Sequence, residues 1–319
     1  MEKVEIVEVG PRDGLQNISQ FVPTDTKVVL IRSLIAAGVK RMEIGSFVSP
    51  KAIPQMADMD DVVRKLGSTP GLRGIALVPN SRGVLRALEA GISDLIFVIS
   101  MSDSHNQSNV RRSTADSIED LRTMLAEVDP DHKLRLRVGL ATSFHCPFEG
   151  VMDEGAVVET IARIADLRAG LELCLADTTG MALPRQVKSL TRRCMDTFKG
   201  RATWCFHGHD TSGFGIANVL AGWEEGLRSF DGAAGGLGGC PFAPGATGNI
   251  ATEDLVMLFE RMGVDTGIDI DRLLESARMA AALPGAVSGG HARSIPRVRL
   301  MGDGLPRERA RSSRSSLVG

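Results

Sequence analysis

The stretch VEIVEVGPRDG at residues 4–14 decides the fold, because it joins a strand pattern to a polar turn. Its first six residues are rich in Val and Ile, as in a buried strand. A doubly wound nucleotide-binding sheet would continue into a GxGxxG loop, whereas this strand continues into GPRDG. The segment therefore favours a barrel over an open sheet.

Strand patterns and amphipathic segments alternate along the rest of the chain. The predicted strands cover residues 4–9, 41–46, 74–78, 94–100, 134–141, 171–176, 202–207 and 229–234. The predicted helices cover residues 26–37, 82–90, 117–128, 155–167, 184–198 and 215–226, and two more, at 252–262 and 270–282, follow the eighth strand. This order predicts an α/β protein, a (β/α)8 TIM barrel with additional C-terminal helices. We expect one barrel domain over residues 1–287 and a basic, flexible tail over residues 288–319.

The composition is that of a folded globular protein and excludes several function classes. Of the 319 residues, 43% are hydrophobic and 24% charged. There are 37 Lys and Arg against 39 Asp and Glu, a formal net charge of −2, whereas nucleic-acid-binding domains are normally strongly basic. Aromatic residues, at 4% with no Tyr, are too few for a base-stacking surface. We therefore expect no nucleic-acid partner.

Five cysteines are scattered along the chain, and none of them forms a CxxC pair. This pattern predicts neither a disulfide framework nor a cysteine-based zinc site. The N-terminal MEKVEIVEVG lacks the features of a signal or transit peptide, and no apolar run reaches the roughly 20 residues that span a bilayer. We therefore expect a soluble, cytoplasmic protein without a membrane partner.

Residues that can carry chemistry follow the predicted strands at their C-terminal ends, where the active sites of such barrels lie. They are Arg12 and Asp13 after the first strand, Glu43 on the second, Asp177 after the sixth, His207 and His209 at the end of the seventh, and Cys240 and Asn249 after the eighth. Their common position predicts that they meet on one rim of the barrel.

His207 and His209 predict a metal site, because residues two apart on a strand point to the same face. Asp13 and Asn249 are the candidate oxygen ligands. A mixed set of nitrogen and oxygen ligands suits Mg²⁺ or Mn²⁺. A zinc ion that recruits Cys240 is the alternative, and Asn249 could instead cap a helix.

Arg12 and Cys240 are candidate catalytic side chains. Arg12 stays protonated and suits the binding of carboxylate or enolate oxygens, or it forms a salt bridge with Glu43 or Asp177. Glu43 could position Arg12 or a metal-bound water, or serve only as a buried ion-pair partner. Cys240 lies in a glycine- and proline-rich loop of the kind that closes over active sites, where a thiol could transfer a proton or act as a nucleophile.

Four motifs are the most distinctive segments of the chain: VEVGPRDGLQN at 7–17, EIGSFVSPKAIPQMAD at 43–58, HGHDT at 207–211 and GLGGCPFAPGATGNIATEDLV at 236–256. Together they resemble the 3-hydroxy-3-methylglutaryl-CoA lyases, a family of metal-dependent TIM-barrel enzymes. The resemblance covers roughly residues 4–285, with order and spacing intact.

The resemblance implies a carbon–carbon lyase that cleaves 3-hydroxy-3-methylglutaryl-CoA to acetyl-CoA and acetoacetate, as in leucine degradation and ketone-body formation. It implies that the divalent metal, Mg²⁺ or Mn²⁺, is bound by Asp13, His207, His209 and Asn249. It further implies catalytic or supporting roles for Arg12, Cys240, Glu43, Asp177 and His207, and acyl-CoA contacts from Arg12, Gln16 and Asn109. By the same analogy the protein forms a homodimer.

Three positions depart from the family pattern. Members often carry a Tyr near the position of Gly139, a Ser where this chain has Cys174, and CPYEG where it reads CPFEG at 146–150. A related tertiary 3-hydroxyacyl-CoA, such as citramalyl-CoA or one with a longer 3-substituent, is therefore an alternative substrate. A Claisen-condensing synthase and a non-catalytic acyl-CoA-binding protein are the remaining alternatives.

Overall fold

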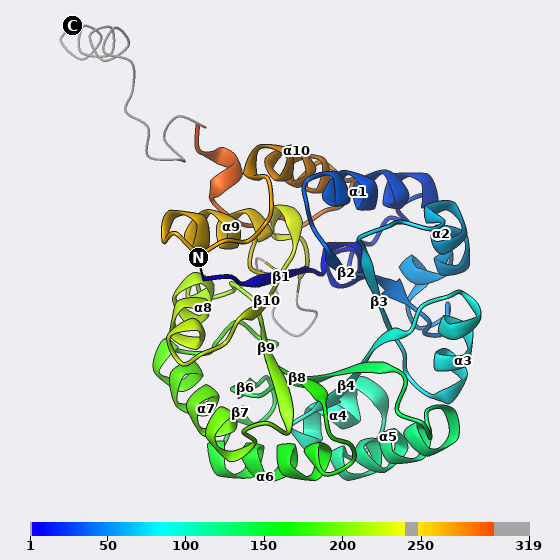
Figure 1. Cartoon of the computed structure of the whole chain (residues 1–319), viewed down its shortest axis with the longest axis vertical. Coiled ribbons are helices and arrows are strands. Elements are labelled where there is room, and N and C mark those ends of the chain that lie inside the picture. Colours follow the sequence, from blue (N-terminus) through cyan, green and yellow to red (C-terminus); the bar gives the residue numbers. More distant parts are fainter. Residues whose placement is uncertain (1, 240–247, 297–319) are drawn as a thin grey trace, which may run out of the picture.

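Eight parallel strands close into a barrel in the computed structural model of the chain, which describes residues 2–239 and 248–296 (Figure 1). Around the barrel the strands follow the order β1-β10-β9-β8-β5-β4-β3-β2. Their bounds are β1 Glu5–Glu8, β2 Arg41–Ser46, β3 Arg73–Leu77, β4 Asp94–Ser100, β5 Arg135–Ala141, β8 Leu171–Asp177, β9 Ala202–Gly208 and β10 Ser229–Gly232. The predicted (β/α)8 barrel is confirmed.

Helices surround the barrel as a ring (Figure 1). They are α1 Thr24–Ala36, α2 Met59–Leu66, α3 Ser81–Glu89, α4 Asp103–Val110, α5 Thr114–Val128, α6 Glu154–Ala165, α7 Pro184–Thr197, α8 Gly215–Glu224, α9 Thr252–Arg261 and α10 Ile270–Ala281. The last two confirm the predicted C-terminal helices. They complete the ring beside β1, where α10 packs against α1 and α9 packs against β1 and β10.

Local sequence signals explain where several helices begin. The Asn80 side chain accepts a hydrogen bond from Gly83 N at the start of α3, and Ser113 and Asp116 form a capping box at the start of α5. Pro184 opens α7, where a missing N–H costs nothing. These signals satisfy or remove free N–H groups at the helix starts and so define where the helices begin.

Four short elements were not among the sequence predictions. Helix α4 reads DSHNQSNV and has no apolar stripe, and α2 has only eight residues. The two-residue strands β6 (His145–Cys146) and β7 (Gly150–Val151) form a small hairpin after β5. Elements of this length carry too few residues for a periodic pattern.

Apolar side chains fill the space between the strands and the ring of helices, which we call the apolar shell. Leu173 and Leu175 of β8, for example, are fully buried, as are Ile161 and Ile164 of α6 and Phe259 of α9. All five belong to one contiguous hydrophobic cluster. This shell is the larger part of the core and follows from the apolar runs of the strands and the apolar faces of the helices.

Charged side chains occupy much of the barrel interior. Arg41 on β2 contacts Glu172 on β8, and Arg137 on β5 contacts Asp231 on β10 and Glu43 on β2. These pairs join strands that are not neighbours in the closed barrel, so the contacts cross its interior. We call these five residues the charged lumen. TIM barrels usually fill this place with bulky branched apolar side chains.

The last described residues, 288–296, lie against the barrel. His291 N donates to both carboxylate oxygens of Asp254, at 3.0 and 2.9 Å, and Ala292 is fully buried. Residues 297–319 of the predicted tail lie outside the described residues. Within the described ranges, every helix is too short or too polar to serve as a transmembrane span.

Candidate active site

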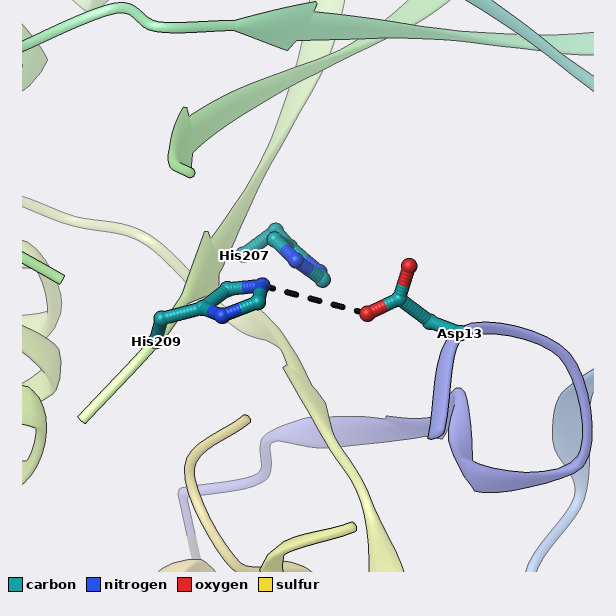
Figure 2. Close-up of side chains that lie close together, drawn as sticks. All are labelled: Asp13, His207 and His209. Carbon is teal, nitrogen blue, oxygen red and sulfur yellow. Dashed lines mark ion pairs between the residues drawn. The ribbon is translucent and has the colours of Figure 1, made fainter. Parts of the chain in front are cut away.

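Three predicted metal ligands meet at the C-terminal rim of the barrel. Asp13 lies in a π-helical turn, η1 (Gly10–Gly14), which directly follows β1, while His207 and His209 lie at the end of β9. One ligand atom from each residue lies within 4.8 Å of the other two. Figure 2 shows the two imidazoles side by side, facing the Asp13 carboxylate across the rim. The structure thus brings together residues about 195 positions apart in the sequence.

Backbone pairing brings Asn249 to the same place. Residues His209 and Asn249 form an isolated antiparallel bridge, and Ile250 N donates to Gly208 O at 3.0 Å. A side chain at Gly208 would clash, because a Cβ there would lie 2.7 Å from a Phe206 ring carbon and 2.8 Å from Ile250. The glycine between the two histidines is therefore what allows the returning segment to approach.

The Asn249 side chain faces the cluster rather than a helix end. Its Nδ2 donates to Asp13 Oδ2 at 2.8 Å and to Leu237 O at 3.0 Å. Helix α9 has Ala251 as its N-cap residue, so the helix-capping alternative is wrong. The Asn249 side chain thus contacts η1, while the backbone around it pairs with the end of β9.

The donor set fits a divalent metal. His209 Nδ1 and Asn249 Oδ1 are buried and have no hydrogen-bond partner among the described residues. His209 Nε2 lies 3.8 Å from Asp13 Oδ2. Buried polar atoms without partners are costly, and a bound ion is one way to satisfy them. Two imidazoles, a carboxylate and an amide oxygen are all groups that bind divalent metals.

The surroundings of the three predicted ligands shift their pKa values differently. Burial lowers the pKa of His207, but its hydrogen bond to Asp231 and the charge of Asp13 outweigh burial and raise the net pKa. Burial and the charge of His207 lower the pKa of His209 to about 4. Burial would raise the pKa of Asp13, yet the adjacent Arg12 charge lowers it below its usual value. A carboxylate and a neutral imidazole are the forms that bind metals.

Arg12 lies between the metal cluster and Glu43. Its Nη1 lies 2.5 Å from Asp13 Oδ1, and Glu43 Oε2 accepts from Nε at 2.6 Å and from Nη2 at 2.5 Å. The salt bridge to Glu43 is thus formed, whereas no contact with Asp177 is present among the described residues. Burial would lower the pKa of Arg12, but the two carboxylates raise it, so the guanidinium stays charged beside the metal ligands.

Asp177 ends β8 on the same rim. Burial raises the pKa of its carboxyl group to about 6, against the lowering effect of backbone donors. Met181 N and Ala182 N each donate to it at 3.1 Å, which fixes its orientation. A buried carboxyl with a raised pKa in such a position has the properties of a general base.

The remaining predicted residues lie apart from this cluster or outside the described residues. Gln16 lies two residues after the end of η1 and is half-buried. Asn109 is exposed on α4. Neither forms a polar contact with the cluster within the described part of the chain. Cys240 lies outside the described residues, so the zinc alternative that invokes it is not tested by the geometry.

Sequence reasoning missed Asp231 and Arg137, which support the cluster from below. Asp231 Oδ2 accepts a hydrogen bond from His207 Nδ1 at 3.2 Å, and Asp231 Oδ1 accepts one from Arg137 Nη1 at 2.7 Å. The sequence feature that could have revealed them is a charged residue within an otherwise apolar strand, as in RLRVGLA at 135–141 and SFDG at 229–232. A buried charge of this kind needs a partner, and here the partner belongs to the site.

A family model described as HMGL-like matches residues 3–280. The chain belongs to the HMGL-like family. Membership implies a divalent metal, and the cluster of Asp13, His207 and His209 offers a place for it. The resemblance read from the four sequence motifs is thereby confirmed.

Individual relatives agree with this assignment. The chain is 44% identical over 295 residues to (R)-citramalyl-CoA lyase of Chloroflexus aurantiacus, covering 89% of this chain and 92% of the relative. It is 39% identical over 280 residues to hydroxymethylglutaryl-CoA lyase YngG of Bacillus subtilis, covering 87% and 92%. A solved HMG-CoA lyase of Acinetobacter baumannii, in complex with coenzyme A and 3-methylmalate, superposes with a TM-score of 0.84 at 39% identity, covering 95% and 98%.

These relatives are carbon–carbon lyases that act on acyl-CoA thioesters, and the predicted enzyme class is confirmed. The binding of coenzyme A by a relative supports the predicted acyl-CoA substrate. The two relatives at 44% and 39% identity are named for different acyl-CoA substrates, citramalyl-CoA and hydroxymethylglutaryl-CoA.

Proposed function

We propose that this chain is a lyase that depends on Mg²⁺ or Mn²⁺ and cleaves 3-hydroxy-3-methylglutaryl-CoA to acetyl-CoA and acetoacetate. The observation that carries the proposal is the cluster of Asp13, His207 and His209, whose ligand atoms lie within 4.8 Å of one another, with the Arg12 guanidinium in contact with Asp13. Metal ligands and a fixed cation on one barrel rim suit the cleavage of a tertiary alcohol that generates an enolate.

Asp13, His207, His209 and Asn249 would bind the metal. When bound, the ion supplies Lewis acidity, which makes the C3 hydroxyl of the substrate easier to deprotonate and orients the neighbouring polar groups. His207 is poorly suited to accept the hydroxyl proton, because Asp231 engages its Nδ1 and its other nitrogen faces the ligand cluster. Asp177, held on the same rim by two backbone N–H groups, is the better acceptor.

Arg12 acts on the other half of the substrate. As the proton leaves the C3 hydroxyl, the C2–C3 bond breaks, C3 becomes a ketone, and the electron pair moves to the thioester as an enolate of acetyl-CoA. The guanidinium, fixed by Glu43 and Asp13, is positioned to donate to the thioester oxygen as this charge develops. Cys240 would then protonate C2 of the enolate, which releases acetyl-CoA.

(R)-Citramalyl-CoA is the second candidate substrate. The chain is 44% identical to a relative named (R)-citramalyl-CoA lyase. It also departs from the usual family pattern at Gly139 and Cys174, which both lie on strands of the barrel. Cys174 lies within the lumen, with its Sγ 3.9 Å from Asp231 Oδ2. Because C3 of citramalyl-CoA carries a carboxylate in place of a carboxymethyl group, the same bond cleavage gives acetyl-CoA and pyruvate.

Product analysis separates the two candidates. Metal-stripped protein is incubated with each acyl-CoA, with and without Mg²⁺ or Mn²⁺, and acetoacetate and pyruvate are quantified. Metal-dependent acetoacetate with a higher kcat/KM for 3-hydroxy-3-methylglutaryl-CoA supports the proposal, whereas preferential pyruvate release assigns the second substrate. Free CoA released from acetyl-CoA and 2-oxo acids would instead indicate a condensing synthase.

We also propose a homodimer and a cytoplasmic location, with residues 1–287 as the barrel domain and residues 288–319 as a tail. The homodimer rests on family analogy alone. Light scattering coupled to size exclusion tests it, since a dimer has twice the 34.0 kDa mass of the chain.

A further inference from the structure

Arg137 lies at the centre of the charged lumen and is nearly inaccessible, with 1% of its side chain exposed. Its Nε and Nη2 donate to the two carboxylate oxygens of Glu172, each at 3.1 Å. Its Nη1 donates to Asp231 Oδ1 at 2.7 Å and lies 3.9 Å from Glu43 Oε1. One guanidinium therefore contacts carboxylates from three different strands.

Two of these carboxylates also contact residues of the candidate active site. Asp231 accepts a hydrogen bond from Arg137 with its Oδ1 and one from His207 Nδ1 with its Oδ2. Glu43 accepts with Oε2 from Arg12, while its Oε1 is buried without a hydrogen-bond partner among the described residues. Arg137 Nη1 lies 3.9 Å from that oxygen, which is within ion-pair range but beyond hydrogen-bond distance. The guanidinium thus lies beneath both the metal cluster and the catalytic arginine.

We propose that Arg137 is a positioning residue that acts through Asp231 on the metal ligand His207 and through Glu43 on Arg12. The rigid fork of the guanidinium, anchored on Glu172, fixes the direction of the Asp231 carboxylate. That carboxylate then accepts the Nδ1 proton of His207, which leaves the lone pair of Nε2 for the metal. The inference rests on the proposed metal-dependent lyase activity, although its main test does not require turnover.

The chain offers a matched control in Arg41. It is also buried, with 8% of its side chain exposed, and it also binds Glu172. Its other carboxylate partner is Glu5, at 2.9 Å, and it contacts neither Asp231 nor Glu43 within the described structure. Arg41→Lys and Arg137→Lys therefore both disturb Glu172, but only Arg137→Lys removes the fork beneath the site.

The test is Mn²⁺ binding to metal-stripped protein, measured by calorimetry for wild type, R137K and R41K after circular dichroism has shown that each is folded. We expect R137K to bind Mn²⁺ about 10–100-fold more weakly, the usual effect of losing an outer-shell partner, and R41K to bind like wild type. Folded R137K with wild-type affinity, or an equal loss in R41K, would overturn the inference.

A second variant keeps the inference testable should R137K fail to fold. In Asp231→Asn, a carboxamide that accepts from Arg137 can only present its NH₂ to His207 Nδ1, which moves the ring proton to Nε2. We expect the same 10–100-fold loss of Mn²⁺ affinity, and unchanged affinity would refute the role of Asp231.

Turnover separates this inference from the proposed function. For R137K we expect kcat to fall with little change in KM, because Arg12 loses orientation more than the substrate loses contacts. A fall in kcat no larger than that of R41K would refute the link through Glu43. A wild-type chain that binds Mn²⁺ but cleaves neither acyl-CoA would refute the proposed function and leave the metal-binding test valid.

Discussion

A buried carboxyl group of the charged lumen and one beside the apolar shell have pKa values that shift in opposite directions. In the lumen, burial alone would raise the pKa of Glu172, but Arg137 and Arg41 lower it to about 2. Beside the shell, Glu8 at the end of β1 accepts hydrogen bonds from two backbone N–H groups and from Thr252 among the described residues, and burial raises its pKa to about 7.

The difference shows what the arginines of the lumen do. Without a cation, a buried carboxyl becomes neutral near physiological pH, and a neutral acid cannot orient a histidine or an arginine by charge. Burial would raise the pKa of both Glu172 and Asp231, but Arg137, which contacts both carboxylates, helps to lower each pKa below its ordinary value. The lumen thus maintains charge for function, whereas the shell provides stability by excluding water.

The largest expected effect comes from removing a metal ligand at the top of the lumen. His209→Ala deletes a buried imidazole of the cluster, so we expect Mn²⁺ affinity to fall by more than about 100-fold, beyond the usual cost of an outer-shell change. The control is His291→Ala, because His291 is 77% exposed and pairs with Asp254 away from the site. Calorimetric Mn²⁺ titration measures both variants, and a tightly binding H209A variant would contradict the assignment.

Arg12→Lys keeps the charge but loses the fork that contacts Glu43 and Asp13. We expect kcat to fall by roughly 10²–10³-fold, the usual effect of losing a donor to a developing oxyanion, with a smaller change in Mn²⁺ affinity. Arg41→Lys serves as the matched control. Steady-state kinetics with 3-hydroxy-3-methylglutaryl-CoA provides the measurement, and an unchanged kcat would remove Arg12 from the mechanism.

A cavity in the apolar shell should reduce stability without changing the site. Phe259 on α9 is fully buried, with its ring centroid 5.3 Å from that of Phe230 and 6.4 Å from that of Trp223. Phe259→Ala should lower the free energy of unfolding by about 3–5 kcal/mol in denaturant titrations. Folded F259A should bind Mn²⁺ like wild type. Weaker metal binding at full folding would show that shell and lumen are coupled.

The smallest effect concerns the pH dependence of stability at Glu8. Its pKa rises from 4.5 in the unfolded chain to about 7 in the folded one, so the folded chain binds the proton more tightly. Stability from this group is complete below about pH 4.5 and falls as pH rises to about 7, by up to about 3 kcal/mol. Glu8→Gln keeps the geometry and should flatten this slope in unfolding titrations between pH 5 and 8. An unchanged slope would show that Glu8 is ionised when folded.

Most of the barrel could be predicted from the sequence because its shell obeys simple periodicity. All eight strands and the helices with clear apolar faces follow from apolar runs and from patterns of 3.6 residues. Helix α4 could not be predicted in this way, because DSHNQSNV lacks an apolar stripe and depends on contacts such as the burial of Asn106.

The site was predictable where a strand end marks it, as for Asp13, His207 and His209. It was not predictable where the partner lies across the barrel interior. Nothing local in the sequence pairs Arg137 with Asp231, 94 residues away, because the pairing arises only when the sheet closes. Asn249 shows the same limit, since its alternative as a helix cap could be rejected only from its contacts with Asp13 and Leu237.

The measurement that tests the account most directly is a Mn²⁺ titration of metal-stripped protein in which ion binding and acetoacetate release from 3-hydroxy-3-methylglutaryl-CoA are followed together. The account predicts no release before metal is added, and activity that rises in step with one bound ion per chain. The account would be contradicted by equal acetoacetate release without metal, or by one ion bound per chain with no acetoacetate released.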